Sequence, residues 1–478
     1  MLFNSLDFLI FLPVVFAGYW LLGRHLRLQN LLVVVASYVF YGWWDARFLV
    51  LIAFTSLWSY LFGLLELGAP ERSRGSKLRL ALSCVVNLGI LGYFKYAGFF
   101  VHEAAELLNA LGFHASVETL KIVLPVGISF YTFQALSYTI DVYRRVLVPT
   151  RDPIAFFAFI SFFPQLVAGP IERATNLLPQ FLRPRTFSYP LAVEGCRQML
   201  WGFFKKILVA DSCAQAANVL LGGDSPSGVA LWLGMVAFAF QIYGDFSGYS
   251  DIAIGCGKLF GIRLMRNFAC PYFSRDIAEF WRRWHISLTT WFRDYLYIPL
   301  GGSRCGTAKK IRNTFAIFLV SGLWHGANWT FLAWGAFHAL CFVPLLVAGR
   351  NRAHVVDVVA SDRAAPSGRE LRGMLLTFLL AVVGWTFFRA PDIATACAWL
   401  GRMFSVVDLA TNHHVVFGRA DHAVLPILVL LAVEWTSRRR ELPVLPRRRW
   451  LRWLVYYLAV YAIFYYRPPP ETFVYFQF

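Results

Sequence analysis

The histidine at position 325 lies where an ionisable side chain is unexpected. The stretch from Thr314 to Gly349 contains no Asp, Glu, Lys or Arg, and His325 stands inside it, within the sequence SGLWHGAN of residues 321–328. Ionisable residues in apolar membrane segments are rare and commonly functional. Burial disfavours the charged imidazolium, so the neutral, proton-accepting form should dominate. The position predicts a general base in a water-poor site, with a histidine hydrogen-bonded between helices as an equally weighted alternative.

Two further histidines are candidates for the same site. His285 belongs to a basic, aromatic segment and could reach the site from its cytoplasmic side, but the pattern alone favours a histidine at the membrane surface. His338 follows His325 in the same apolar stretch. On one straight helix these two side chains would point to different faces. We therefore expect His338 to be packed in the core.

Charged side chains near residue 250 allow two interpretations. Asp245 and Asp251 flank the sequence FSGYS and could do acid–base chemistry or bind a cation. Helix capping and the tethering of arginines such as Arg282 explain them more simply, and we favour that interpretation. The basic residues from Lys258 to Arg312 could hold a phosphate-rich donor such as coenzyme A. Orientation of the chain in a membrane explains them at least as well.

The composition indicates the class of protein in which these residues must be positioned. The chain has 478 residues, of which 58% are hydrophobic and 15% are charged, whereas soluble proteins have about 25% charged residues. Long charge-free runs recur along the chain, and a bilayer span needs ~20 mostly apolar residues. We predict an all-α, polytopic membrane protein in which residues 1–478 form one membrane domain.

Charge and cysteine usage exclude other classes. The net charge is +18, but the basic residues cluster between apolar runs, as the positive-inside rule predicts. We therefore expect no nucleic-acid partner. The eight cysteines are scattered and form no metal-binding motif, so we expect neither a metal site nor a disulfide framework.

About 11–14 membrane helices are expected, some of them tilted or re-entrant. Candidate spans lie at 6–22, 30–44, 49–65, 80–94, 122–140, 154–169, 192–210, 229–243, 314–324, 328–348, 373–388, 422–436 and 453–466. They divide the chain into N-terminal helices (1–243), a basic, aromatic interfacial or re-entrant region (244–312), catalytic helices (313–348), a cytoplasmic loop (349–372) and C-terminal helices (373–478). With the most basic connectors in the cytoplasm, both termini are periplasmic.

Part of the region 244–312 predicts a single amphipathic helix. At helical spacing an aromatic face and a basic face alternate over residues 279–297. The aromatic face holds Trp281, Trp284, Leu288, Trp291 and Tyr295, and the basic face holds Arg282, His285, Thr289 and Arg293. Such a helix suits the membrane interface better than a lipid-spanning position.

Several motifs together resemble the membrane-bound O-acyltransferase family, over essentially the whole chain. The chain looks most like the bacterial branch that acetylates exported polysaccharides such as alginate. The motifs are Leu2–Ser5, Asn30–Asp45, Leu124–Phe130, Phe163–Pro170, Asp245–Asp251, Trp281–Leu288 (WRRWHISL), Asp294–Gly302, Gly322–Asn328 (GLWHGAN) and Val474–Phe478.

The resemblance implies a fold and a site. Members of the family form a ring of tilted helices around a thinned centre with a tunnel between the two faces. The invariant catalytic histidine of the family falls on His325, and the second family position falls on His285. The donor acyl thioester enters from the cytoplasm, so acetyl-CoA is the expected donor. Donor-tunnel contacts are then expected at Arg282, Arg283, Trp284 and Asn328, with no metal and no bound cofactor.

The resemblance also implies partners. In this branch the acetyl group passes across the inner membrane to a periplasmic SGNH-type acetyltransferase, which modifies the polymer. Acyl transfer for peptidoglycan, cellulose or D-alanyl teichoic acid is the alternative within the family. A transporter of polysaccharide or lipid-linked sugar is the alternative of another class. Transporters commonly show two repeated halves, and no repeat is visible in this sequence.

Overall fold

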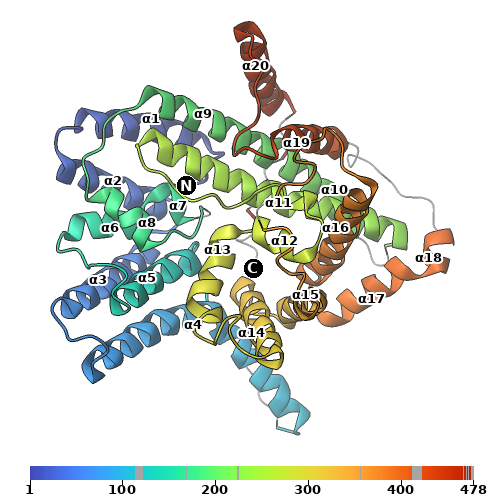
Figure 1. Ribbon diagram of the computed structural model, residues 1–478, viewed down its shortest axis with the longest axis horizontal. Helices are drawn as coiled ribbons and strands as arrows, with labels where there is room; N and C mark the ends of the chain where they lie inside the picture. Colours follow the sequence, from blue (N-terminus) through green and yellow to red (C-terminus); the bar gives the residue numbers. More distant parts are fainter. Residues whose placement is uncertain are drawn as a thin grey trace. The chain divides into compact units, whose positions relative to one another are not determined.

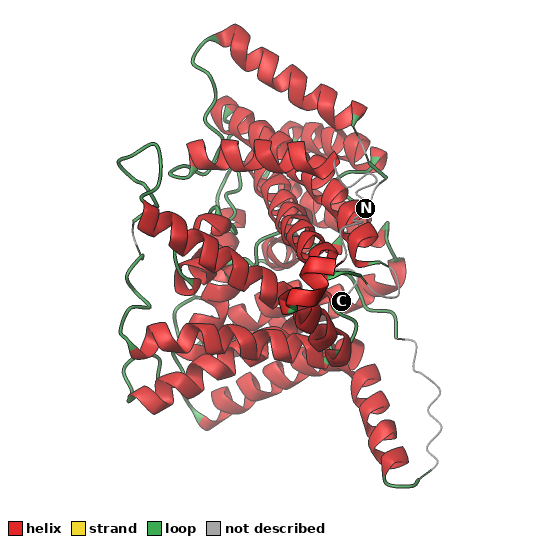
Figure 2. Ribbon diagram, turned by 90° about the vertical axis from the view of Figure 1, so that its right-hand side faces the viewer, coloured by secondary structure: helices red, strands yellow, loops and turns green. Residues whose placement is uncertain are grey.

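The computed structural model describes the chain except residues 114–121, 168, 223–225, 356, 412–421, 467, 470, 472 and 475–478. Every regular element in the described part is a helix, so the predicted all-α class is confirmed (Figures 1 and 2). The chain forms two compact units. The first comprises residues 1–196 and 253–265, and the second comprises residues 197–252 and 266–478. The end of the motif Val474–Phe478 lies outside the described residues.

The described residues of the first unit form the helices α1 to α8, a short 3-10 helix, the start of α9 (Tyr189–Phe203) and the end of α11 (Gly228–Leu259). In it α2 packs against α6, and α5 packs against both α3 and α4. The buried carboxylate of Glu66 in this unit accepts hydrogen bonds from Ser76 Oγ at 2.6 Å and Arg79 Nε at 2.7 Å. Its elements are α1 Leu6–Leu21, α2 Leu26–Gly42, η1 Ala46–Phe48, α3 Leu49–Glu66, α4 Arg74–Ala110, α5 Ile128–Tyr143, α6 Pro153–Ser161, α7 Phe163–Leu166 and α8 Ala174–Phe181.

The helix α9 (Tyr189–Phe203) leads into the second unit, which contains the predicted site. Its elements are the π-helix η2 Phe204–Ala210, α10 Asp211–Leu221, α11 Gly228–Leu259, η3 Pro271–Phe273, α12 Ile277–Arg283, α13 Ile286–Phe292, the π-helix η4 Arg293–Tyr297, α14 Thr307–His325, α15 Trp329–Val347, α16 Gly368–Arg389, α17 Ile393–Phe404, α18 Val406–Thr411, α19 Val424–Ser437 and α20 Arg449–Tyr465. Large aromatic side chains, among them Trp284, Trp334 and Trp385, fill its core.

Five described helical segments are long and apolar enough to cross a bilayer. They are Ala46–Glu66, Arg74–Ala110, Gly228–Leu259, Trp329–Val347 and Gly368–Arg389, and five shorter apolar helices accompany them. The chain is therefore a multi-pass membrane protein. The number of helices that cross the membrane, given above as about 11–14, stays a prediction. A short helix crosses only where the membrane is thin, and elsewhere it does not span the bilayer.

The single amphipathic helix predicted over residues 279–297 is wrong. The helix breaks after α12 because His285 adopts left-handed backbone angles, with φ 43° and ψ 55°. A neighbouring segment supplies the hydrogen bonds that a continuous helix would have made. The N–H of Ala269 donates to the Arg283 carbonyl at 3.0 Å, and the N–H of Ile286 donates to the Asn267 carbonyl at 2.8 Å. The break turns His285 away from the predicted basic face and into the interior, where it is 1% exposed.

Helices α14 and α15 pack with their backbones in contact (Figure 1). A Cβ atom on Gly322 would lie 2.2 Å from the carbonyl oxygen of Phe331, and one on Gly335 would lie 2.3 Å from that of Phe318. Small residues at such positions allow close approach of membrane helices. The tight packing fixes the end of α14, and with it His325, against α15.

Candidate active site

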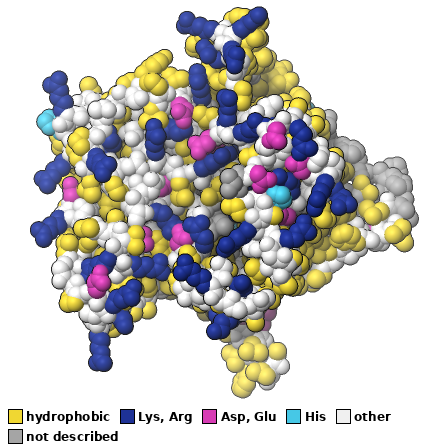
Figure 3. Space-filling view, viewed as in Figure 1, with side chains coloured by type: hydrophobic (Ala, Val, Ile, Leu, Met, Phe, Trp, Pro, Cys, Tyr) yellow, Lys and Arg dark blue, Asp and Glu magenta, His cyan; other side chains and the backbone are white. Residues whose placement is uncertain are grey.

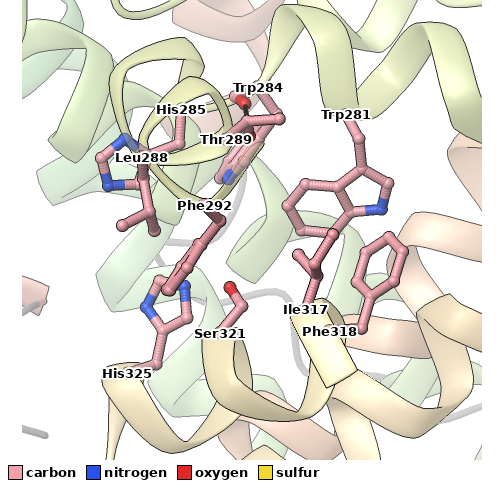
Figure 4. A pocket seen from close by; sticks show the side chains of 10 residues that line it. All are labelled: Trp281, Trp284, His285, Leu288, Thr289, Phe292, Ile317, Phe318, Ser321 and His325. Atoms are coloured by element: carbon pink, nitrogen blue, oxygen red, sulfur yellow. Dashed lines mark hydrogen bonds between the residues drawn. The ribbon is translucent and has the colours of Figure 1, made fainter. Parts of the chain in front are cut away.

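A cavity of about 50 Å³ lies in the second unit between α12–α13 and α14. Figure 4 shows His285 and His325 at one end of it, and Trp281 and Phe318 at the other. Apart from the two imidazoles, its polar side chains are Thr289 and Ser321. The structure thus brings together the two histidines that the sequence predicted. The space suits a small acyl group or a few water molecules.

His325 is the last residue of α14 and is 4% exposed. Aromatic rings surround its imidazole; the centroids of Trp324, Trp334 and Phe388 lie 5.0, 5.1 and 5.3 Å away. Ser321 stands one helical turn earlier, and its hydroxyl points into the cavity (Figure 4). Apolar surroundings in general disfavour a charged imidazolium, and the neutral imidazole is the form that accepts a proton.

The imidazole of His285 is hydrogen-bonded to a side chain that is itself held by a second one. Its Nδ1 lies 3.0 Å from Asn267 Oδ1, and Asn267 in turn donates from Nδ2 to Ser250 Oγ at 3.0 Å. The ring packs edge-on to Phe246 at 4.5 Å. Burial lowers the pKa of His285 from 6.5 to about 3, so its neutral form dominates at physiological pH. Left-handed backbone angles at a non-glycine residue commonly accompany functional sites.

His338 lies closer to His325 than one straight helix would allow. The chain breaks between α14 and α15, and Trp334 separates the two imidazoles, with ring centroids 5.1 Å from His325 and 5.2 Å from His338. His338 is fully buried, as the prediction of a packed core histidine requires. It does not line the cavity, because Trp281 lies against it at 4.9 Å.

The residues predicted to contact the donor are engaged in several ways. Trp284 lines the cavity. Arg282 donates to the carbonyl oxygens of Asn351 and His354, at 2.8 and 3.2 Å, and Arg283 binds Glu279 at 2.8 Å. Asn328 caps α15, accepting from the N–H of Thr330 at 2.9 Å. Arg283 also donates to the carbonyl oxygens of Ala269 and Asp357, at 3.3 and 3.2 Å. Both arginines therefore tie α12 to neighbouring chain segments, and their role toward a donor stays a prediction.

Asp245 and Asp251 do not tether Arg282. Asp245 forms an ion pair with Lys206 at 2.9 Å, and Lys206 also binds Asp211 at 2.7 Å. Asp251 pairs with Lys205. The preference for a structural role thus agrees with the contacts, although the cations are consecutive lysines of the π-helix η2.

Basic side chains are frequent on the molecular face shown in Figure 3, where acidic side chains are fewer. The excess agrees with the net charge of +18. Basic surface residues both orient a chain in a membrane and attract phosphate-bearing molecules. The basic excess of the chain is therefore suited to an anionic membrane surface or an anionic donor.

Sequence reasoning missed two residues of the site. Ser321 could have been found, because it precedes His325 by one helical turn and so shares its helix face. Asn267 gives no such signal, since it reaches His285 only through the fold. Its position in the loop after α11 is set by the hydrogen bonds to residues 285 and 286.

The second unit places two buried histidines beside a small, largely apolar cavity, an arrangement compatible with a membrane-bound acyl-transfer enzyme. The sequence profile of the membrane-bound O-acyltransferase family matches residues 144–381. The chain belongs to this family and is an acyltransferase.

Curated relatives cover most of the chain. It is similar to the probable alginate O-acetylase of Pseudomonas aeruginosa, with 45% identity over 406 residues that make up 85% of this chain and 75% of that protein. The peptidoglycan O-acetyltransferase of Helicobacter pylori is 34% identical over 446 residues, 86% of this chain and 81% of that protein. The teichoic acid D-alanyltransferase of Streptococcus thermophilus is 31% identical over 232 residues, 46% of this chain and 56% of that protein.

Proposed function

We propose that the protein transfers acetyl groups from cytoplasmic acetyl-CoA across the inner membrane for O-acetylation of an exported polysaccharide such as alginate. The observation that carries the proposal is the pair of buried histidines, His285 and His325, at one end of a small cavity. The choice of polymer is supported by sequence identity. The chain is 45% identical to the alginate O-acetylase and 34% identical to the peptidoglycan O-acetyltransferase. Peptidoglycan is the second candidate acceptor.

The chemistry proposed for the site is acyl transfer with general-base catalysis. His325 takes the proton of an acceptor hydroxyl while the hydroxyl oxygen forms a bond to the thioester carbonyl carbon. The carbon–sulfur bond then breaks, and the proton leaves with the thiol. A base positioned in this way contributes about 10²–10⁴-fold in rate. The hydroxyl of Ser321, which points into the cavity (Figure 4), is placed to donate to the carbonyl oxygen as negative charge develops on it.

The size of the cavity supports a short acyl group. Its volume of about 50 Å³ and the rings of Trp281 and Phe318 at the end opposite the histidines suit a short acyl group. We further propose that both termini lie on the periplasmic side, and that a periplasmic SGNH-type acetyltransferase receives the acetyl group and modifies the polymer. Arg282, Arg283, Trp284 and Asn328 remain the proposed contacts of the donor on its path to His325.

The decisive experiment measures acetyl esters on the secreted polymer. Cells lacking the protein are complemented with the wild type, with His325→Ala or with His25→Ala, a matched control at an exposed histidine of the first unit. We expect His325→Ala to abolish acetylation at normal membrane levels of the protein, and His25→Ala to preserve it. Full acetylation by His325→Ala contradicts the proposal. Lost polymer export with unchanged acetylation indicates a transporter instead.

The donor requires its own test. Membrane vesicles that expose the cytoplasmic face are given radiolabelled acetyl-CoA, and the label released from the thioester is followed over time. We expect release with the wild type and none above background with His325→Ala. Release that is equal in both preparations removes acetyl-CoA as the donor of this site.

A further inference from the structure

The orientation of the Asn267 side chain is fixed by a backbone group. The backbone N–H of Ser287 points at Asn267 Oδ1 from 3.3 Å, and Ser287 Oγ lies 2.9 Å from the same atom. A backbone N–H can only donate, so the atom that faces it must be the amide oxygen. Asn267 Nδ2 is then the group that donates to Ser250 Oγ at 3.0 Å. Asn267 is fully buried, which keeps water from replacing these bonds.

This orientation determines which nitrogen of His285 carries the proton. Nδ1 lies 3.0 Å from Asn267 Oδ1, and an amide oxygen is only an acceptor. Nδ1 must therefore be the donor, and in a neutral imidazole Nε2 then carries a lone pair. Nε2 of His285 is buried and makes no hydrogen bond to any described residue, while the imidazole lines the cavity (Figure 4).

We propose that Asn267 is a positioning residue that holds His285 with its Nε2 lone pair toward the cavity, so that His285 accepts a hydrogen bond from an N–H or O–H group of bound substrate. The proposal rests on the proposed function, because the substrate is the thioester donor or the hydroxyl acceptor of that reaction. It also limits the role of His285. A neutral imidazole in this tautomer cannot polarise the acyl carbonyl by donating a hydrogen bond to it.

Few charged groups face His285. At the same end of the cavity stands another titratable side chain, His325, on α14. On α11, Asp245 adjoins Phe246, and its charge is balanced by Lys206 at 2.9 Å. On α12, Arg282 is directed to the carbonyls of the loop that follows α15, and burial alone accounts for the lowered pKa of His285. Ser287 Oγ also lies 3.4 Å from His285 Nδ1. Asn267 Oδ1, at 3.0 Å, is the nearer acceptor for the Nδ1 proton.

Substitution of Asn267 separates positioning from packing. Asn267→Leu has a similar volume but offers His285 no acceptor. Loss of tautomer control in a catalytic triad lowers kcat by about 10⁴-fold, so we expect Asn267→Leu to lose at least about 10²-fold at every pH. Asn267→Asp keeps an acceptor oxygen against Nδ1, but its carboxylate also favours the imidazolium, in which Nε2 carries a proton. Its activity relative to wild type should therefore rise with pH.

The matched control is Asn313→Asp, which converts another fully buried asparagine of the second unit. Its amide bonds to the Leu300 carbonyl and to Arg312, away from the cavity lining. We expect its pH profile to keep the shape of the wild-type profile. Equal activities of Asn267→Asp and Asn267→Leu with no pH dependence would show that Asn267 only fills space, and would overturn the proposal.

A direct measurement keeps the proposal testable even if these variants fold poorly or acetyl-CoA is not the donor. Nitrogen-15 NMR of histidine-labelled wild-type protein, with the His285 signals assigned by their absence from His285→Gln, reports which ring nitrogen carries the proton. We expect a protonated Nδ1 and a bare Nε2. A proton on Nε2 in the neutral ring refutes the proposal and leaves the proposed function untouched. If wild-type protein shows the expected tautomer but releases no thiol from acetyl-CoA, the proposed donor fails and Asn267 keeps its role.

The kinetic constants identify which substrate His285 holds. With acetyl-CoA and an acceptor hydroxyl compound varied separately, a KM for acetyl-CoA that rises in Asn267→Leu identifies an N–H of the donor arm. A KM for the acceptor that rises instead identifies its O–H. Either result supports the proposal, whereas unchanged kcat and KM for both substrates contradict it.

Discussion

Lys206 Nζ lies 2.9 Å from Asp245 Oδ1, and both side chains are buried within the second unit. The same lysine binds Asp211 at 2.7 Å. Asp245 also accepts, at Oδ2, a hydrogen bond of 2.7 Å from the backbone N–H of Val474. One buried cation thus joins α10, α11 and the C-terminal segment.

Lys206→Met should be strongly destabilising. It removes the cation and leaves the carboxylates of Asp211 and Asp245 buried without it, and breaking a buried ion pair typically costs about 3–5 kcal/mol. Thermal unfolding of the purified protein in detergent measures the change. Arg47→Ala is the control, since it breaks an ion pair whose arginine is 76% exposed, and such pairs contribute about 1 kcal/mol or less. Adding Asp245→Asn to Lys206→Met should recover part of the lost stability. No recovery would show that the buried charge of Asp245 is not the cause of the loss.

Gly335→Ala should destabilise the protein and lower its activity together. The added methyl group would lie 2.3 Å from the Phe318 carbonyl oxygen, so α15 must move away from α14, which carries His325. Overpacking of this kind costs about 1–3 kcal/mol. The control is Gly89→Ala in α4, where a Cβ atom meets nothing within 4 Å; there we expect about 0.5–1 kcal/mol of stabilisation from alanine in a helix. Equal thermal midpoints for the two variants would show that α14 and α15 are not tightly packed.

The sequence was sufficient to predict the helical class. It also singled out His325, because an imidazole in a charge-free stretch is rare enough to be informative, and the catalytic role of His325 stays a prediction. It failed at the break between α12 and α13. No glycine or proline marks residues 283–286, and the spacing of aromatic residues fits a continuous helix. The break depends on two backbone hydrogen bonds to another segment: Ile286 donates to the carbonyl of Asn267, and Ala269 donates to the carbonyl of Arg283. Tertiary contacts of this kind override local helical pattern.

Arg282 is the residue for which a charge role and an anchoring role can be separated. Its guanidinium donates to two carbonyls of the loop after α15, at 2.8 and 3.2 Å. Lysine keeps the charge but lacks the planar fork. If Arg282 acts mainly as an anchor, Arg282→Lys and Arg282→Ala should both speed hydrogen exchange in residues 350–357. If its charge attracts the donor, only Arg282→Ala should raise the KM for acetyl-CoA.

We expect faster hydrogen exchange in both variants. The planar guanidinium of Arg282 can donate to both carbonyls at once, and the ammonium group of a lysine cannot replace it. Arg263→Ala is the control, since this arginine belongs to the first unit. It should change neither the exchange of the loop nor the KM. Slow exchange that persists in Arg282→Ala would mean that other contacts, such as the ion pair of 2.7 Å between Arg275 and Asp357, hold the loop without it.

His338→Leu should be tolerated, in contrast to His325→Ala. Neither ring nitrogen of His338 makes a hydrogen bond to a described residue, and the imidazole is enclosed by aromatic rings such as Trp281 and Trp334, at 4.9 and 5.2 Å. Replacing an unsatisfied buried polar group by an apolar one of similar shape is nearly neutral or stabilising. We therefore expect an unchanged or higher thermal midpoint and activity within a few-fold of wild type. A loss of activity at normal stability would instead assign His338 to the reaction, acting through Trp334, which it shares with His325.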